Sequence, residues 1–237
     1  KLKHKPYIVF TPKLLGLDSF YHSKNIDFLL SYNDLPNDKY IHNSSLCPSR
    51  LRRYSNYKID TSDINQFKIS LSEHNIYNQN VKDQRGLPRK FDPITCPHNK
   101  NKWIMDFITQ ISALSILNHN YLNHTCIINN KIKKISVDLH QVRQFSCDTL
   151  SHNAPEGIHQ DGADYIVSAF IINRSNIVGG NSTIYNNKQN LLLSHTLKNE
   201  QGIFQNDKDL YHNVSPIQSK SDYLGFRDII GLDIKFL

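Results

Sequence analysis

The apolar positions of the chain follow a helical pattern in one stretch of its first half. In NKWIMDFITQISALSILNHN, residues 101–120, large apolar side chains recur every three to four positions and form one stripe. The members of this stripe are Trp103, Phe107, Ile111 and Leu114. The spacing predicts a helix over 102–118 whose apolar face packs against the core.

From Ile135 onward the pattern changes to short β-branched segments separated by Gly, Asn and Pro, which is typical of strands joined by turns. In the last segment every second side chain is apolar, so Arg227 is expected on the opposite face. The pairs Gly179-Gly180 and Asn186-Asn187 indicate turns. The predicted strands lie near 135–146, 164–172, 181–186, 190–197, 203–206, 211–217 and 224–236.

Seven short strands within about a hundred residues favour an antiparallel double-sheet jelly roll. We therefore expect an α+β, mainly β fold: a double-stranded β-helix (jelly roll, cupin-like) core with N-terminal helices packed on one outer sheet. A chain of 237 residues can form such a fold as a single domain. Within it, residues 1–134 would be a mixed helical and strand part, and 135–237 the jelly-roll core that carries the functional site.

The apolar runs are far too short to cross a bilayer, and Pro6 interrupts the basic N-terminus without a cleavage pattern after it. We expect no membrane span and no secretory signal. The cysteines are scattered and form no CxxC pair, which argues against a disulfide framework and a zinc site. They are Cys47, Cys96, Cys126 and Cys147. Reduced cysteines would fit a cytoplasmic protein.

A formal charge of +7 permits nucleic-acid binding, and RLRRYSNYK, which starts at Arg50, is a basic cluster with interleaved tyrosines. The remaining Lys and Arg residues are dispersed along the chain, which is more typical of a solvated surface. A nucleic-acid partner is therefore not the favoured expectation. The sequence carries no indication of an oligomeric state.

The segment EGIHQDGAD, residues 156–164, contains a histidine and a carboxylate one residue apart. In an extended segment His159 and Asp161 project to the same side, so one metal ion could bind both. Gly157 and Gly162 leave room for a tight turn at the end of a strand. In a chain with 12 histidines, however, an isolated HxD pair also arises by chance and can be an ordinary polar turn.

A further histidine would complete a metal site, and His195 and His212 are the downstream candidates. Only His212 is followed, fifteen residues later, by an arginine on the inward face of a strand, Arg227. Two histidines and one carboxylate leave three positions of an octahedral iron open, as in non-haem Fe(II) oxygenases. An arginine then suits the far carboxylate of a bound 2-oxo acid. Zinc with three protein ligands and a water is the competing interpretation.

Several longer segments resemble one known family. EGIHQDGADYIVSAFIINRSNIVGGNSTIY, YHNVSPI and GFRDII resemble the bacterial 2-oxoglutarate/Fe(II)-dependent dioxygenases that include the L-isoleucine 4-hydroxylases. DLPNDKY, RLRRYSNYKI, LPRKFDPI and VDLHQVRQF also resemble that family, so the similarity spans most of the chain.

The resemblance implies that His159, Asp161 and His212 are iron ligands and that Arg227 holds a carboxylate of 2-oxoglutarate. It implies Fe(II), 2-oxoglutarate and dioxygen as cofactors and cosubstrates, with ascorbate as an activator in vitro. The substrate would be a small molecule, a free aliphatic L-amino acid like isoleucine, leucine or methionine. Hydroxylation would release succinate and CO2.

Arg143 is expected to bind a carboxylate of the substrate or the cosubstrate, and Asp164 the ammonium group of the substrate. The cluster Arg50, Arg52 and Arg53 matches basic positions of the family, either near the substrate or in a structural role. Asn181 departs from the family pattern, where an acidic residue is expected, which would change specificity if this position touches the substrate. The alternative function is a non-catalytic metal- or nucleic-acid-binding β-protein that uses the basic cluster at 50–58.

Overall fold

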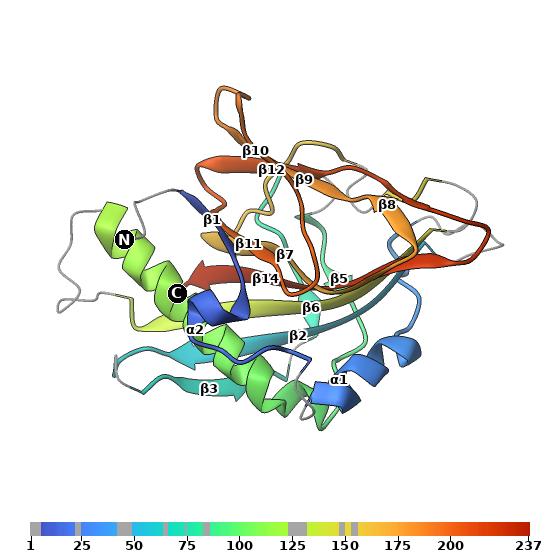
Figure 1. The fold of residues 1–237 in the computed structure, drawn as a ribbon. Helices are drawn as coiled ribbons and strands as arrows, with labels where there is room; N and C mark the ends of the chain where they lie inside the picture. The colour runs from blue at the N-terminus through green and yellow to red at the C-terminus, as the bar shows by residue number, and fades with distance from the viewer. Residues whose placement is uncertain are drawn as a thin grey trace.

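A seven-stranded antiparallel sheet forms the centre of the molecule, whose structure is a computed structural model (Figure 1). Its strands, in spatial order, are β1 (Tyr7–Phe10), β11 (Gly202–Asn206), β7 (Tyr165–Ser175), β14 (Gly225–Phe236), β6 (Lys134–Ser146), β2 (Arg50–Asp60) and β3 (Lys68–Leu71). The structure describes residues 6–21, 25–41, 49–63, 66–73, 75–82, 86–122, 132–146, 150–152 and 156–237.

A smaller sheet lies over one face of the large sheet, toward the top of Figure 1. Its strands are β10 (Leu191–Thr196), β9 (Asn181–Asn186) and β12 (Leu210–Val214). Two short pairs complete the described strands: β13 (Ile217–Ser219) with β8 (Ile177–Gly179), and β4 (Ile76–Tyr77) with β5 (Arg89–Lys90). The predicted mainly β, double-sheet jelly roll is confirmed.

The other face of the large sheet is covered by α2 (Lys102–Leu122), which continues beyond the predicted end at residue 118. The side chain of Asn101 caps its first turn by accepting the backbone N–H of Ile104 at 3.1 Å. Phe107 is fully buried, with its ring centroid 5.3 Å from that of Phe170 on β7. The predicted apolar stripe therefore faces the sheet.

Shorter helical segments lie beside α2. They are the 3-10 helices η1 (Pro12–Leu15), η3 (Ser31–Asp34) and η5 (His98–Lys100), and the single-turn helix α1 (Ile26–Leu30). Figure 1 shows α1 and α2 on the same side of the large sheet, as predicted for the N-terminal helices.

Two apolar layers result from this arrangement. The larger lies between the large sheet and the helices and includes Leu139 on β6 and both Ile230 and Leu232 on β14. The smaller lies between the two sheets and includes Val142 on β6 and Ile184 on β9. Alternating side chains of the central strands thus enter different layers.

The sheets differ from the prediction at several points: β1, β3, β4, β5 and β8 were not among the predicted strands, and two further differences concern β12 and β2. The segment predicted as one strand over 211–217 is divided at Pro216, which has no N–H to donate: β12 pairs with β9, and β13 pairs with β8. The strand β2, whose sequence was interpreted as a basic cluster, pairs with β6 along its whole length. Arg50 and Arg52 of β2 face the space between the sheets, whereas Leu51 faces the helices.

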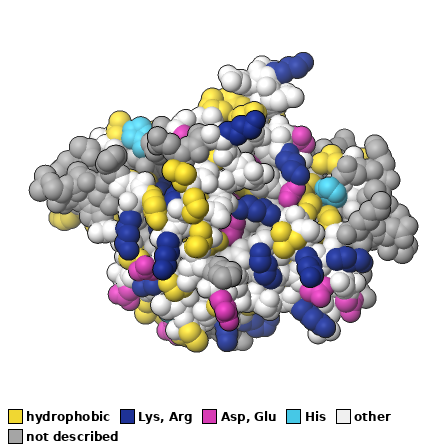
Figure 2. Space-filling model, turned by 180° about the vertical axis from the view of Figure 1, so that it is seen from behind, with side chains coloured by type: hydrophobic (Ala, Val, Ile, Leu, Met, Phe, Trp, Pro, Cys, Tyr) yellow, Lys and Arg dark blue, Asp and Glu magenta, His cyan; other side chains and the backbone are white. Residues whose placement is uncertain are grey.

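The described residues bear on the predictions about membrane spans, cysteines and surface charge. No helix among the described residues combines the length and apolarity that a bilayer crossing requires. Cys96 is exposed, and the predictions for Cys47, Cys126 and Cys147 fall outside the described residues. On the face shown in Figure 2, Lys and Arg side chains are spread among other side chains.

Candidate metal and cosubstrate site

His159 and His212 are joined through their backbones. The N–H of His159 donates to the carbonyl oxygen of His212 at 3.0 Å, and the N–H of His212 donates back at 2.9 Å. This bridge continues the edge of the small sheet beyond β12 and brings the two ring centroids to 4.3 Å. Two histidines that lie far apart in the chain therefore become neighbours.

Asp161 completes a group of three candidate metal ligands. One ligand atom from each of His159, Asp161 and His212 lies within 4.8 Å of the others. The Nε2 atom of His159 is 3.6 Å from Oδ1 of Asp161, and Nε2 of His212 is 3.5 Å from Oδ2. Bond lengths of about 2.1 Å to a common ion would place neighbouring ligand atoms about 3 Å apart. The three side chains fit one metal ion.

The hydrogen bond of the other ring nitrogen favours metal binding by His159. Its Nδ1–H donates to the carbonyl oxygen of Gly157 at 2.7 Å, which leaves the lone pair on Nε2. For His212, the side-chain amide of Gln205 lies 3.4 Å from Nδ1. Oε1 of Gln205 is buried and has no hydrogen-bond partner among the described residues. Exchanging the amide N and O positions lets Oε1 accept the Nδ1–H of His212.

Two of the three side chains, Asp161 and His212, have protonation states that suit a cation. Burial raises the pKa of Asp161, but its hydrogen bond with His159 and the nearby histidine charges outweigh burial and lower it. Burial lowers the pKa of His212 to about 4, so this ring is neutral at pH 7. Burial also opposes protonation of His159, but the hydrogen bond with Asp161 raises its pKa. Metal binding would displace that proton.

Asp207, in the turn after β11, holds the segment that carries Asp161. Its Oδ2 accepts the backbone N–H groups of Asp161, Gly162 and Ala163 at 3.0, 2.8 and 3.1 Å. Gly162 has a φ of +78°, and a Cβ here would lie 2.6 Å from the carbonyl oxygen of Asn80. Burial and the Asp161 charge raise the pKa of Asp207 to about 8. A cation bound at Asp161 would oppose this shift.

A second polar contact reaches Asp161 from the N-terminal half. The side-chain amide of Gln79 donates to Oδ1 of Asp161 at 2.7 Å, and Arg89 donates to Oε1 of Gln79. Neither Gln79, Asp207 nor Arg89 was among the predicted site residues. They lie in turns or short strands, where the sequence has no periodic pattern that marks them.

The three candidate ligands open into a cavity of about 890 Å³ between the two sheets. Apolar side chains from five strands line part of it: Val142, Ala169, Ile184, Ile203 and Ile229. Charged side chains line another part: Arg50, Arg52, Arg89, Glu156, Arg227 and Asp233. The cavity thus combines a candidate metal site, an apolar wall and several cations.

Arg227 lies in this cavity, on the face of β14 that the alternation predicted. Its Nε donates to Oε1 of Gln144 at 2.8 Å, which fixes the guanidinium plane. Arg174 is its register partner on β7. Burial lowers the pKa of Arg227 to about 9, and the Arg174 charge acts in the same direction. Arg227 remains protonated at pH 7, as carboxylate binding requires.

Gly180 leaves space beside these two arginines. It has a φ of +65°, and a Cβ at this position would lie 3.0 Å from Nη1 of Arg227 and 3.1 Å from Nη1 of Arg174. The glycine therefore permits the backbone to pass close to both guanidinium groups.

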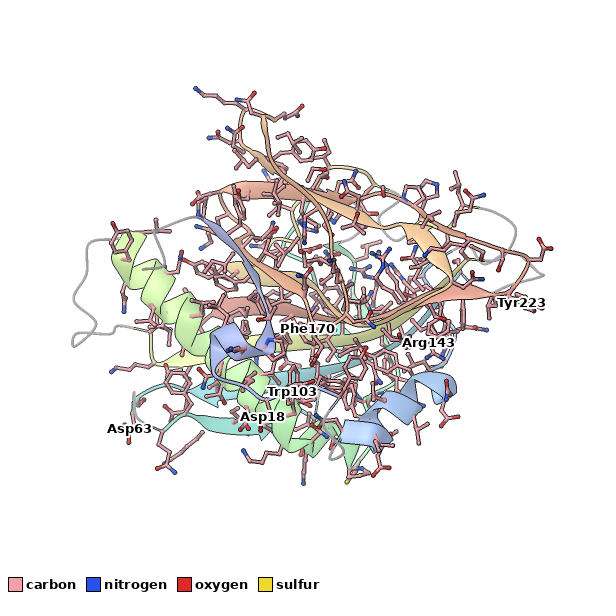
Figure 3. The ribbon with its side chains drawn as sticks, in the orientation of Figure 1. Asp18, Asp63, Trp103, Arg143, Phe170 and Tyr223 are labelled. Atoms are coloured by element: carbon pink, nitrogen blue, oxygen red, sulfur yellow. The ribbon has the colours of Figure 1, made fainter. Side chains whose placement is uncertain are left out.

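Arg143 lies on the opposite face of the large sheet, on the side of η3 (Figure 3). Its Nε and Nη2 donate to Oδ1 and Oδ2 of Asp228 at 2.6 and 2.8 Å, and Nη1 donates to Asn33 at 2.8 Å. Strand alternation explains the placement, because Val142 occupies the cavity face of β6. This position does not support the substrate-binding role expected for Arg143.

Asp164 is also outside the cavity lining. It forms an ion pair with Lys208, and its Oδ2 accepts the backbone N–H of Phe236 at 2.7 Å. These contacts fasten the end of β14 and do not support a role in binding the substrate ammonium group.

The arginine cluster predicted on β2 divides between the cavity and the opposite side of the strand. Arg50 and Arg52 line the cavity. Arg53 instead donates to the carbonyl oxygens of Pro93 and Asp34 at 3.0 and 3.2 Å, which gives it a structural role.

Two other positions considered in the sequence lie away from the ligand group. Asn181 donates to Ser194 at 2.8 Å and is not part of the cavity lining. His195, the alternative ligand, lies on β10, where its Nε2 is 3.2 Å from Oε1 of Gln201. It is outside the group of three candidate ligands.

Several solved structures share this fold. The crystal structure of IDO from Bacillus thuringiensis is 22% identical, with a TM-score of 0.74 over 98% of this chain and 95% of that one. A bsmA homolog from Methylobium petroleophilum PM1 is 17% identical, with a TM-score of 0.77 over 97% and 88% of the two chains. The Fe(II)/α-ketoglutarate-dependent dioxygenase TqaL is 16% identical, with a TM-score of 0.63 over 98% and 83%.

At these identities the structural likenesses show the fold alone. Comparison with the sequences of curated proteins finds no match. The model of the 2OG-Fe dioxygenase family, however, matches residues 30–233, which is most of the chain and includes all three candidate ligands and Arg227. The protein therefore belongs to the 2OG-Fe dioxygenase family, which uses Fe(II), 2-oxoglutarate and dioxygen.

Proposed function

We propose that this dioxygenase hydroxylates a free aliphatic L-amino acid like isoleucine, leucine or methionine, with conversion of 2-oxoglutarate to succinate and CO2. The observation that carries the proposal is that the His159, Asp161 and His212 ligand group and Arg227 line one cavity. The amino-acid substrate is suggested by the resemblance of the sequence motifs to the L-isoleucine 4-hydroxylase family.

In this proposal the Nε2 atoms of His159 and His212 and the carboxylate of Asp161 hold Fe(II). Two histidines and one carboxylate are the set of protein ligands that non-haem Fe(II) oxygenases use. When bound, the iron supplies the activation of dioxygen that oxidises an unreactive C–H bond. The protein residues hold the reactants in place and separate them from bulk water.

Arg227 is proposed to bind the distal carboxylate of 2-oxoglutarate. Its Nε–H already donates to Gln144, which holds the guanidinium group in one orientation, and Gly180 leaves space beside Nη1. The positive charge of Arg174 lies on the adjacent strand and adds to the attraction for a dianion.

The cavity lining supports a small substrate with an aliphatic side chain and a charged end. Val142, Ala169 and Ile203 supply apolar contacts, and arginines and carboxylates share the same cavity. Because Arg143 and Asp164 lie elsewhere, the charged end of the substrate needs other partners.

The test is turnover by purified protein with Fe(II), 2-oxoglutarate and ascorbate, with L-isoleucine, L-leucine or L-methionine added separately. Succinate should rise above the amount formed without amino acid, and mass spectrometry should detect a product heavier by one oxygen atom. Asp161→Ala should lose turnover because it removes one metal ligand. The control Asp106→Ala changes a carboxylate on α2 whose side chain is 43% exposed.

Absence of both succinate stimulation and oxidised product in the wild-type protein, with iron confirmed as bound, would refute the amino-acid proposal. Equal turnover by wild type and Asp161→Ala would refute the assigned ligand. The alternative nucleic-acid role of the 50–58 cluster gains no support, because Arg50 and Arg52 are only 9% and 8% exposed.

A further inference from the structure

The cavity is lined by three arginines that the iron and 2-oxoglutarate roles do not use, and Arg50 is the one of them that is paired closely with Asp38. Arg52 on β2 and Arg89 on β5 both line it. The Nε atom of each is buried and has no hydrogen-bond partner among the described residues. A buried N–H without an acceptor is costly, so the protein alone does not satisfy either guanidinium group fully.

The contacts of Arg52 hold its guanidinium plane in one orientation. Nη2 lies 2.6 Å from Nδ1 of His140, and the guanidinium carbon lies 4.3 Å from the ring centroid of Phe91. Its Nη1 is 3.9 Å from Oδ2 of Asp38, a carboxylate that Arg50 binds more closely, at 2.8 Å. Arg52 therefore retains hydrogen-bonding capacity toward a ligand.

His140, on β6, links Arg52 to residues of other strands. Because Nδ1 of His140 accepts from Arg52, the neutral ring carries its proton on Nε2, which lies 3.4 Å from Oδ2 of Asp233. Tyr77 donates to the same carboxylate oxygen. The chain of contacts from Asp233 through His140 to Arg52 fixes the position of the arginine.

Arg89 and Arg52 carry like charges and lie near the same aromatic ring, that of Tyr77. Its guanidinium carbon is 4.9 Å from the ring centroid of Tyr77, and that of Arg52 is 5.4 Å from the same centroid. Burial lowers the pKa of Arg89, and the Arg52 charge lowers it further. An anion between the two guanidinium groups would offset this repulsion.

We propose that Arg52 and Arg89 form a carboxylate-binding subsite that holds the α-carboxylate of the amino-acid substrate. Planar guanidinium groups match the two oxygens of a carboxylate, and two of them in the cavity lining would give the substrate a defined direction. This inference rests on the proposed amino-acid hydroxylation and identifies the residues that recognise the charged end of its substrate.

The same contacts connect the subsite to the metal site. Arg89 donates to Gln79, and Gln79 donates to Oδ1 of Asp161 at 2.7 Å. A substrate carboxylate on Arg89 would therefore be separated from an iron ligand by only the side chain of Gln79.

The test compares Arg89→Gln with the control Lys90→Gln, which removes a cation from the adjacent, exposed position of β5. Calorimetry would measure binding of L-isoleucine and L-isoleucinamide to the anaerobic protein loaded with Fe(II) and 2-oxoglutarate. Loss of a hydrogen bond to a charged group predicts a roughly 10- to 100-fold weaker Kd for L-isoleucine in Arg89→Gln. The preference for L-isoleucine over its amide should fall by a similar factor, and Lys90→Gln should keep both values.

An unchanged preference for carboxylate over amide in Arg89→Gln would overturn the subsite, even if both ligands bound more weakly. Arg89→Lys should recover part of the preference by restoring the charge. Binding of 3-methylpentanoate, which has a carboxylate but no ammonium group, distinguishes the two proposals. If the wild type binds 3-methylpentanoate but no amino acid, and Arg89→Gln weakens that binding, the amino-acid function is refuted and the subsite is supported. If Arg89→Gln binds 3-methylpentanoate as wild type does, the subsite is refuted as well.

Discussion

At the scale of single residues, Asp207 shows how one side chain prepares the metal site. One oxygen accepts three consecutive backbone N–H groups, from Asp161, Gly162 and Ala163, and the other lies 4.0 Å from Nδ1 of His212. The carboxylate thus lies between two segments that each carry a candidate ligand. Contacts of this kind orient metal ligands without touching the metal.

We predict that Asp207→Asn weakens metal binding about 10- to 100-fold, because an amide is a poorer acceptor for the three N–H groups. Titration with Co(II) in place of Fe(II), followed by visible absorption, would measure the affinity. Asp209→Asn is the matched control, since Asp209 is an exposed carboxylate in the same turn. Wild-type affinity in Asp207→Asn would contradict this role.

At the scale of elements, β6 and β14 separate structural from functional charges by strand alternation. Arg227 faces the cavity, whereas its neighbour Asp228 binds Arg143 on the helix side of the sheet. The register places Arg143 directly opposite Asp228, with both buried. The ion pair joins the two central strands on the face of the sheet opposite the cavity.

We predict that Arg143→Met lowers the free energy of unfolding by about 3–5 kcal/mol, because it leaves the buried Asp228 without its partner. Urea unfolding would measure the loss, and the double variant Arg143→Met/Asp228→Asn should recover part of it. The KM for 2-oxoglutarate should stay at the wild-type value. A raised KM with unchanged stability would instead assign Arg143 a direct role in binding.

At the scale of the whole molecule, polar residues occupy positions in the sheet that would otherwise be apolar. Asp38, Arg52, His140 and Asp233 form a buried series of contacts across β2, β6 and β14. Burial of such groups requires each to be paired or neutral. Burial, with the Arg52 charge acting in the same direction, lowers the pKa of His140.

This lowered pKa predicts that the unfolding free energy falls as the pH decreases below about 6.5, the usual pKa of an unfolded histidine. Below that pH the unfolded chain binds a proton that folded His140 does not, so acid favours unfolding. His140→Gln should therefore show a smaller loss between about pH 7.5 and about pH 5.5 in urea unfolding. Equal losses in wild type and variant would contradict the buried neutral histidine.

Sequence patterns predicted the elements with regular, one-sided burial. The alternation in β14 placed Arg227 on the cavity face, and the apolar stripe placed α2 against the sheet. The strand β2 was missed because its cavity face carries Arg50 and Arg52, which look like surface residues in the sequence. Arg89 was missed because it lies in the two-residue strand β5, which is too short for a periodic pattern.

Local sequence patterns were sufficient to predict most strands after residue 134, the face of β14 that carries Arg227, and the common direction of His159 and Asp161. These features depend on side-chain periodicity between near neighbours. His212 was predicted as the third ligand, and the fold brings it beside that pair, whereas the pairing of Arg143 with Asp228 and the support of the site by Gln79 and Asp207 became visible only in the folded molecule. Those contacts join segments far apart in the chain, and their partners follow from sheet register and packing, which local periodicity does not specify.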